Sequence, residues 1–162
     1  METAARRFVE GLVAAGTVSG AVISLDGTPI AAGRLGFGDY PPMPTDAIFR
    51  IQSMTKVITA VAALRQVDRG VLGLDDPVVD WLPELADRRV LRHPGADLAD
   101  TVPARGAITL RHLLTNTCGY GAQVIDSPLH RAMIANGTEV EFAPPQLDAQ
   151  AWLEALAQLP LA

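Results

Sequence analysis

Apolar residues recur every three or four positions in three segments of the chain, which predicts three amphipathic helices. The first helix is expected over residues 4–15, ending before Gly16, and the last over residues 147–159. The longest is expected from Ser53 to Gly70. Its apolar stripe covers about five helical turns and consists of Met54, Val57, Ile58, Val61, Leu64 and Val67.

Two shorter apolar runs near the amino terminus predict a β-hairpin. The runs cover residues 21–25 and 30–36, and Asp26-Gly27 lies between them. An Asp-Gly pair accepts the positive φ angles of a tight two-residue turn. Together with the helices, the hairpin predicts an α+β fold.

The middle of the chain gives weaker signals. Asp76 before Pro77 predicts a capped short helix over residues 75–85, and Thr109 is expected to cap another over residues 110–117. Residues 91–107 carry turn formers without periodicity, which predicts a long loop. Residues 121–145 support no assignment. Trp81 and Trp152 lie on apolar stripes and are predicted to be core residues.

Length and composition indicate one globular domain over residues 1–162. The net charge of −5 and the lack of a basic cluster argue against nucleic-acid binding. No segment has the length and apolarity of a membrane span or signal peptide, so we expect no membrane association and a cytoplasmic location. Cys118 is the sole cysteine, which excludes an internal disulfide and suits a small buried thiol in a reducing compartment.

The three histidines have no mutual helical spacing, so no metal site or cofactor is expected. His112 lies on a predicted short helix and could in principle act as a base. Its neighbours favour a packed or hydrogen-bonded histidine instead.

The segment "FRIQSMTKV" carries the strongest candidate chemistry. Ser53 and Lys56 stand three residues apart, and residues at this spacing share one face of a helix. A serine hydroxyl needs a neighbour that takes its proton, and lysine suits this role because its pKa falls on burial. If Ser53 is the first helical residue, its backbone N–H at the positive end of the helix dipole is suited to hold an oxyanion.

The alternative interpretation is that Ser53 caps the helix and Lys56 is a surface cation. Lys56 is the single lysine among thirteen basic residues, and the chain has four serines. The chance that a lone lysine falls three places after a serine is therefore 4/162, or roughly 1 in 40. This spacing favours a functional pair.

Three separated blocks resemble the serine β-lactamase and penicillin-binding-protein superfamily, on its class C and esterase-like branch. These are the hairpin segment "GAVISLDGTPIAAGRLGFGD", the helical segment "IFRIQSMTKVITAVAALRQVDRGVLGLDDPVVDWLPEL" and "ITLRHLLTNTCGYG". The resemblance implies a β-lactamase/transpeptidase-like α+β fold. It also implies that Ser53 is the acylated nucleophile and Lys56 the residue that accepts or relays its proton. The implied substrate is a small ester or amide, with β-lactam and D-amino-acid peptide among the candidates.

Two further motifs of the resembled family are missing from their expected places. Neither Tyr40 nor Tyr120 is followed by x-Asn, and no serine is. His93-Pro94-Gly95 matches His-x-Gly as a string, but its proline is unsuited to a strand and it comes too early in the chain. We therefore expect an incomplete domain that lacks the carboxy-terminal strands.

Such a domain would leave a sheet edge unpaired, which predicts self-association or binding of a complementing chain. Two hypotheses follow. In the first, the chain is part of a serine hydrolase that forms a Ser53 acyl-enzyme. In the second, it is a non-catalytic remnant or interaction module that keeps the helical part of the fold.

Overall fold

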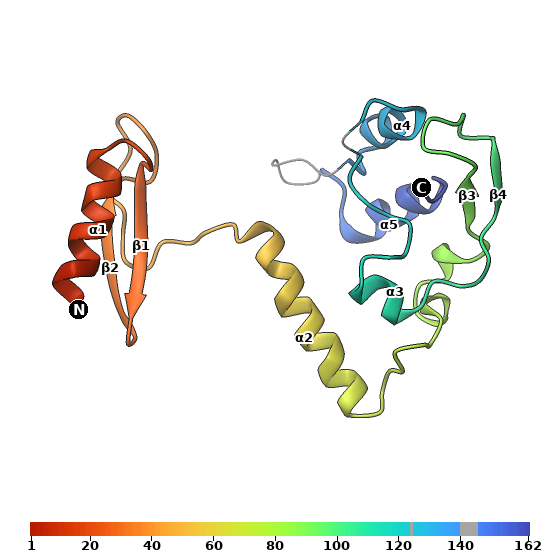
Figure 1. Ribbon diagram of the computed structural model, residues 1–162, viewed down its shortest axis with the longest axis horizontal. Helices are drawn as coiled ribbons and strands as arrows, with labels where there is room; N and C mark the ends of the chain where they lie inside the picture. The colour runs from red at the N-terminus through yellow and green to blue at the C-terminus, as the bar shows by residue number, and fades with distance from the viewer. Residues whose placement is uncertain (124, 140–145) are drawn as a thin grey trace. The chain divides into compact units, whose positions relative to one another are not determined.

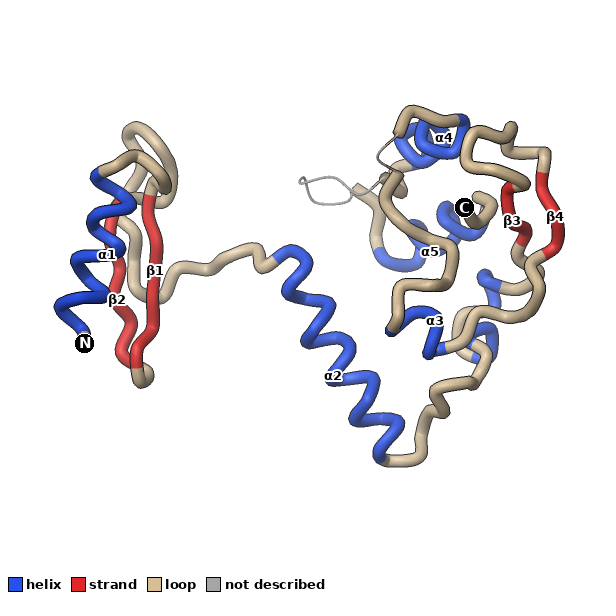
Figure 2. Tube along the Cα trace, in the orientation of Figure 1, coloured by secondary structure: helices blue, strands red, loops and turns tan. Residues whose placement is uncertain are grey.

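The computed structural model describes residues 1–123, 125–139 and 146–162, and the chain divides into two compact units. The first unit is Met1–Met54 and the second is Thr55–Ala162. Figure 1 labels the elements of each, and Figure 2 separates helices, strands and loops. Each unit has buried residues of its own. Whether residues 1–162 behave as a single domain in solution stays a prediction.

The first unit is a helix packed on a β-hairpin. Helix α1 (Glu2–Ala14) lies against both strands of an antiparallel pair, β1 (Gly20–Leu25) and β2 (Thr28–Gly33). Val9 of α1 and Ile30 of β2 are its buried hydrophobic residues. The predicted amphipathic helix and hairpin are therefore present, and both helix and second strand begin two residues earlier than expected.

The hairpin turn has the predicted chemistry. Leu25 pairs with Thr28, so Asp26 and Gly27 form a two-residue loop. Both have left-handed backbone angles, with φ of 47° and 83°. This geometry follows the right-handed twist of the flanking strands and favours Asp-Gly.

The predicted long helix is present and starts later than expected. A 3-10 turn, η1 (Gln52–Met54), is followed by α2 (Thr55–Asp68), so Ser53 lies in the turn and is not the first residue of the helix. The helix stops before Gly70, whose φ of 69° is left-handed. None of the residues of α2 is buried.

The short helix predicted after Asp76 is instead two 3-10 turns, η2 (Val78–Asp80) and η3 (Pro83–Leu85). Pro83 has no N–H to continue a helix from η2, which accounts for the break. The Asp76 carboxylate does not cap η2 but accepts the backbone N–H of Gly73 at 2.6 Å. Trp81 was predicted to be a core residue, yet it is 51% exposed.

The loop predicted over residues 91–107 contains strand structure. Strand β3 (Arg89–Leu91) pairs antiparallel with β4 (Thr101–Pro103), and three-residue strands are too short to show alternation in the sequence. Leu161 joins β3 from the other side, because its N–H donates to Arg89 and its carbonyl accepts from Leu91.

Three capped helices complete the second unit: α3 (Leu110–Leu114), α4 (Pro128–Asn136) and α5 (Ala149–Ala157). The side chains of Thr109, Ser127 and Asp148 each accept a backbone N–H in the first turn of their helix. The cap at Thr109 and the carboxy-terminal helix were predicted. Helix α4 falls in the segment that supported no assignment, part of which lies outside the described residues.

Two hydrophobic clusters hold these elements together. One gathers residues of β3, α4 and the segment after α5, and its members are Leu91, Ala96, Leu129, Met133 and Leu159. The other joins η2 and η3 to the segment before α3 and to the chain end, and its members are Val78, Leu85, Ile108 and Leu161. Cys118 is half-buried against the second cluster, as a small packing residue.

The left-handed turn gives a test within the first unit. Gly27→Ala should lower the unit's free energy of unfolding by about 1–2 kcal/mol, since only the positive φ opposes the added methyl group. A Cβ at Gly27 would meet no atom within 4 Å. The measurement is hydrogen exchange of the β1 and β2 amides.

Gly11→Ala is the matched control. Gly11 lies in α1, is exposed, and also has open space around a built Cβ. Because alanine is the better helix former, this variant should gain up to about 1 kcal/mol. Equal effects of the two substitutions would contradict the assigned turn.

Candidate active site

Ser53 is the second residue of η1 and follows a backbone position of unusual geometry. Gln52 has a φ of 48°, in the left-handed region that non-glycine residues seldom adopt. The turn is closed by the N–H of Met54, which donates to the carbonyl of Ile51 at 3.0 Å. Ser53 is exposed. Strained backbone at a candidate nucleophile is a feature that functional sites often carry.

Lys56 is the second residue of α2 and is also exposed. It lies in the first turn of the helix, next to Thr55, whose carbonyl accepts the Thr59 hydroxyl at 3.0 Å. The boundary between the two units falls after Met54, so Ser53 belongs to the first and Lys56 to the second. Their action as a pair stays a prediction.

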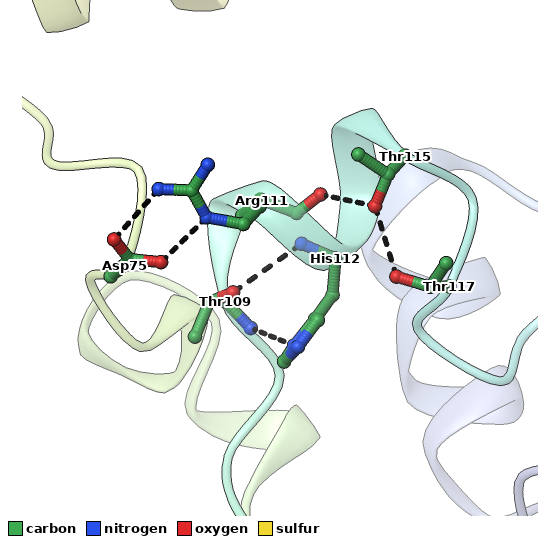
Figure 3. A network of polar contacts seen from close by, with 6 residues as sticks. All are labelled: Asp75, Thr109, Arg111, His112, Thr115 and Thr117. Carbon is green, nitrogen blue, oxygen red and sulfur yellow. Dashed lines mark hydrogen bonds and ion pairs between the residues drawn. The ribbon is translucent and has the colours of Figure 1, made fainter.

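A polar network surrounds the short helix α3 in the second unit (Figure 3). The Thr109 hydroxyl accepts the His112 N–H at 3.3 Å, and the Thr109 N–H donates to His112 Nδ1 at 3.1 Å. This reciprocal arrangement is a capping box with histidine in the place usually taken by Glu or Gln. His112 is thus a hydrogen-bonded structural residue, as its sequence context favoured.

Arg111 ties α3 to the segment before η2. Its Nε and Nη2 donate to the two carboxylate oxygens of Asp75 at 2.7 and 2.8 Å, as Figure 3 shows. The hydrogen bonds from Arg111 hold the pKa of Asp75 below its usual range, and the same contact raises the pKa of Arg111. Asp75 is therefore engaged in this ion pair and does not serve as a cap.

The end of α3 is fixed by two threonines. The Thr115 hydroxyl donates to the Arg111 carbonyl at 2.8 Å and lies 2.9 Å from the Thr117 hydroxyl. Asn116 between them has a left-handed φ of 55°. Asparagine tolerates this conformation better than most residues, which suits its place directly after the helix.

Tyr120 is held by a hydrogen bond and by hydrophobic packing. Arg88 Nη1 donates to its hydroxyl at 3.2 Å and also to the carbonyl of Ala157. Burial raises the pKa of Tyr120, so its phenol is protonated at neutral pH. The side chain packs against the second hydrophobic cluster.

The described part of the chain contains no group of three or more His, Cys, Asp and Glu residues placed to hold a metal ion. It also contains no helix that is long and apolar enough to cross a bilayer. A cavity of about 470 Å³ lies in the second unit beside β3 and β4, with Leu85, Arg88 and Pro103 in its wall. Neither Ser53 nor Lys56 lines this cavity.

Comparison with known protein families gives a match over almost the whole chain. The family model described as Beta-lactamase matches residues 5–162. The chain belongs to this family. The α+β prediction and the resemblance seen in the sequence are both confirmed by the match.

Relatives of the chain in the Beta-lactamase family include an esterase. Protein Rv1367c of Mycobacterium tuberculosis (strain ATCC 25618 / H37Rv) is 40% identical over 154 residues, which are 91% of this chain and 36% of that protein. Esterase EstB of Burkholderia gladioli is 38% identical over 123 residues, or 74% of this chain and 28% of that protein. The chain thus spans about a third of these relatives.

Solved structures of the same fold support the family assignment. EstCE1, described as a hydrolase with promiscuous acyltransferase activity, aligns with a TM-score of 0.67 at 32% identity, over 98% of this chain and 40% of that one. Simvastatin synthase (LovD) from Aspergillus terreus aligns with a TM-score of 0.60 at 27% identity, over 96% and 46%. The chain therefore has a part of the family fold.

The Asp75–Arg111 pair yields a prediction about pH. Because the folded-state pKa of Asp75 is depressed, its contribution to stability is present above the unfolded value of about 3.9 and is lost as the pH falls through the folded-state pKa. Arg111→Lys should raise the pKa of Asp75 toward about 3.9, since lysine cannot make the two parallel hydrogen bonds. An NMR titration that follows the carboxyl carbon of Asp75 measures this pKa.

The control is Arg92→Lys. Arg92 contacts a different carboxylate, Asp100, at 2.9 Å. This variant should leave the pKa of Asp75 unchanged. The assignment fails if the Asp75 titration is the same in the parent chain and in Arg111→Lys.

Proposed function

We propose that this chain carries the nucleophile of a serine esterase or acyltransferase. Ser53 takes the acyl group and Lys56 takes the serine proton. The supporting observation is that the Ser53-x-x-Lys56 sequence lies within the matched residues 5–162 of a family whose relatives carry esterase and acyltransferase names. The family match supports a functional pair more strongly than the spacing alone, which would arise by chance in roughly 1 in 40 cases.

The proposed reaction has two halves. Ser53 Oγ attacks the carbonyl carbon of an ester while Lys56 Nζ receives the hydroxyl proton. The bond to the leaving alcohol then breaks, and that alcohol takes a proton as it departs. In the second half, water or another alcohol attacks the acyl-serine, loses a proton and releases the acid or a new ester, which restores the Ser53 hydroxyl.

The choice of lysine matters for this mechanism. A general base must be able to exist without its proton, and arginine stays charged at any relevant pH. Lys56 is the one lysine of the chain, whereas every other strongly basic side chain is arginine. This composition supports a chemical role at position 56 and makes Lys56→Arg an informative substitution.

The names of the relatives favour an oxygen ester as the acyl donor. They include an esterase from Burkholderia gladioli, the acyltransferase mokF of Monascus pilosus and a monacolin J acid methylbutanoyltransferase of Aspergillus terreus. We therefore place a small ester ahead of a β-lactam or a D-amino-acid peptide. Both hydrolysis and transfer follow from one acyl-serine, and the acceptor decides between them.

A second candidate function is a non-catalytic module. It is favoured by the exposure of both Ser53 and Lys56, which does not by itself form an enclosed site. In this alternative, Ser53 would have no special reactivity.

A fluorophosphonate separates the two functions. We expect one phosphonyl adduct on Ser53, with loss of fluoride, detected by intact mass and peptide mapping. Lys56→Arg should slow its formation about 10²- to 10⁴-fold, the usual contribution of a positioned base. Ser53→Ala should abolish the adduct.

Ser24→Ala is the matched control, because Ser24 is an exposed serine on β1 and should not affect the adduct. A parent chain that takes no adduct would favour the non-catalytic module, whereas equal reaction of Ser53 after Lys56→Arg would contradict the proposed role of Lys56.

A further inference from the structure

The end of α4 carries an Asn-Gly pair, which is chemically reactive in a flexible peptide. The chain has two asparagines, Asn116 and Asn136, and Asn136 is the one that precedes a glycine. Asparagine is thermolabile, because the backbone nitrogen of the next residue can attack its side-chain amide carbon. Glycine favours this attack, since it has no side chain in the way and its backbone is permissive. The sequence alone thus predicts that Asn136 deamidates before Asn116.

The structure fastens the Asn136 side chain at both ends of its amide group. Its Nδ2 donates to the carbonyl of Ala155 in α5 at 3.0 Å. Its Oδ1 accepts the Thr138 hydroxyl at 2.7 Å and the Thr138 N–H at 3.2 Å. Thr138 is fully buried, with an exposure of 0%. We call these three hydrogen bonds the Asn136 clamp, and they join the end of α4 to α5.

The nitrogen that would attack is held as well. Asn136 is the last residue of α4, and Gly137 is its cap in the left-handed conformation, with a φ of 77°. The Gly137 N–H donates to the carbonyl of Ile134 at 3.3 Å and so closes the last turn of the helix. To reach Asn136 Cγ, the nitrogen must leave this turn while the clamp releases the amide. The folded second unit therefore opposes the reaction that the sequence favours.

We propose that Asn136-Gly137 is a deamidation site that the Asn136 clamp keeps closed, and that the reaction permanently opens the clamp. The Gly137 nitrogen attacks Asn136 Cγ and loses its proton, and ammonia leaves. Water then opens the succinimide ring to aspartate or isoaspartate. The new carboxylate has no N–H for the Ala155 carbonyl, so two acceptors face each other where a hydrogen bond joined α4 to α5. A negative charge at the carboxyl end of a helix is also unfavourable.

The first test compares deamidation of the 162-residue chain when folded and when denatured in urea, at the same mildly alkaline pH. Peptide mapping by mass spectrometry detects the acid, which is heavier than the amide. We expect Asn136 to react at least about tenfold more slowly in the folded chain, because the reaction needs a local opening. Asn116 is the internal reference and should react more slowly than Asn136 in urea.

Thr138→Val tests the clamp, because valine has a similar shape and lacks the hydroxyl donor. We expect it to speed deamidation of Asn136 in the folded chain about tenfold, whereas Thr138→Ser, which keeps the hydroxyl, should resemble the parent. Hydrogen exchange of the Val78 amide, which donates to the Ile108 carbonyl, measures general unfolding in the same samples. An equal rise in deamidation and in Val78 exchange would assign the protection to the stability of the whole unit and contradict the clamp.

The consequence of the reaction is tested with its product. Asn136→Asp should raise hydrogen exchange of the α5 amides at least about tenfold, because α5 loses its hydrogen bond to α4. Asn116→Asp is the matched control. Asn116 is exposed and follows α3, so this variant should leave α5 exchange unchanged.

Three results would overturn the proposal. Absence of acid at Asn136 in urea would remove the reactive site. Equal rates of deamidation in the folded and the denatured chain would show that the clamp gives no protection. Unchanged exchange of α5 in Asn136→Asp would show that the product leaves α4 and α5 joined.

Discussion

The burial that α2 requires is the constraint on which the rest of the structure depends. A fourteen-residue helix is marginal in water when only its own hydrogen bonds hold it. Tertiary packing must therefore stabilise it, and Val57, Ile58, Val61 and Leu64 are the side chains suited to that packing. Each contributes about 1.5–3 kcal/mol when fully buried. Together they amount to as much as the net stability of a whole domain, about 5–15 kcal/mol.

The proposed chemistry is attached to the same helix. Ser53 lies in the turn that precedes α2 and Lys56 in its first helical turn. A nucleophile and its base must be held within a fraction of an ångström, which requires a rigid support. Packing of α2 would therefore also fix the element that carries the two residues proposed to react.

The region around α3 shows the contrasting case of a self-contained structure. Its short helix is capped by Thr109 and His112 and tied to the preceding segment by Arg111 and Asp75. The adjoining core is closed by Leu161, which pairs with β3 and packs with Val78 and Ile108. The hydrogen bonds of its cap and of its ion pair are therefore made within the second unit.

Local signals in the sequence predicted much of the fold. The Asp26-Gly27 turn, the cap at Thr109 and the periodic helices each depend on a few adjacent residues, and the structure contains them. Strands β3 and β4 depend on pairing between distant short segments, so no periodicity revealed them. The sequence predicts that Asp76 caps a helix, but its carboxylate instead accepts a hydrogen bond from the Gly73 N–H. The two arrangements compete for the same carboxylate.

The candidate site was predicted from Ser53 and Lys56 in the same way, by spacing and composition. The left-handed backbone at Gln52 gave no signal, because glutamine has no preference for that conformation. No signal in the sequence indicated that the apolar residues of α2 are exposed. A periodic stripe indicates which residues want to be buried, whereas it does not indicate whether the covering surface belongs to the same 162 residues.

Hydrogen exchange of the 162-residue chain by itself tests the central claim most directly. Because none of its residues is buried, α2 should open easily, and its amides from Thr59 to Val67 should exchange at rates near those of an unstructured peptide. The amides of α5, which contributes Leu156 to the buried residues, should exchange at least about a hundredfold more slowly than those of α2. Equal protection of α2 and α5 would contradict the account, because α2 would then be held by this chain alone.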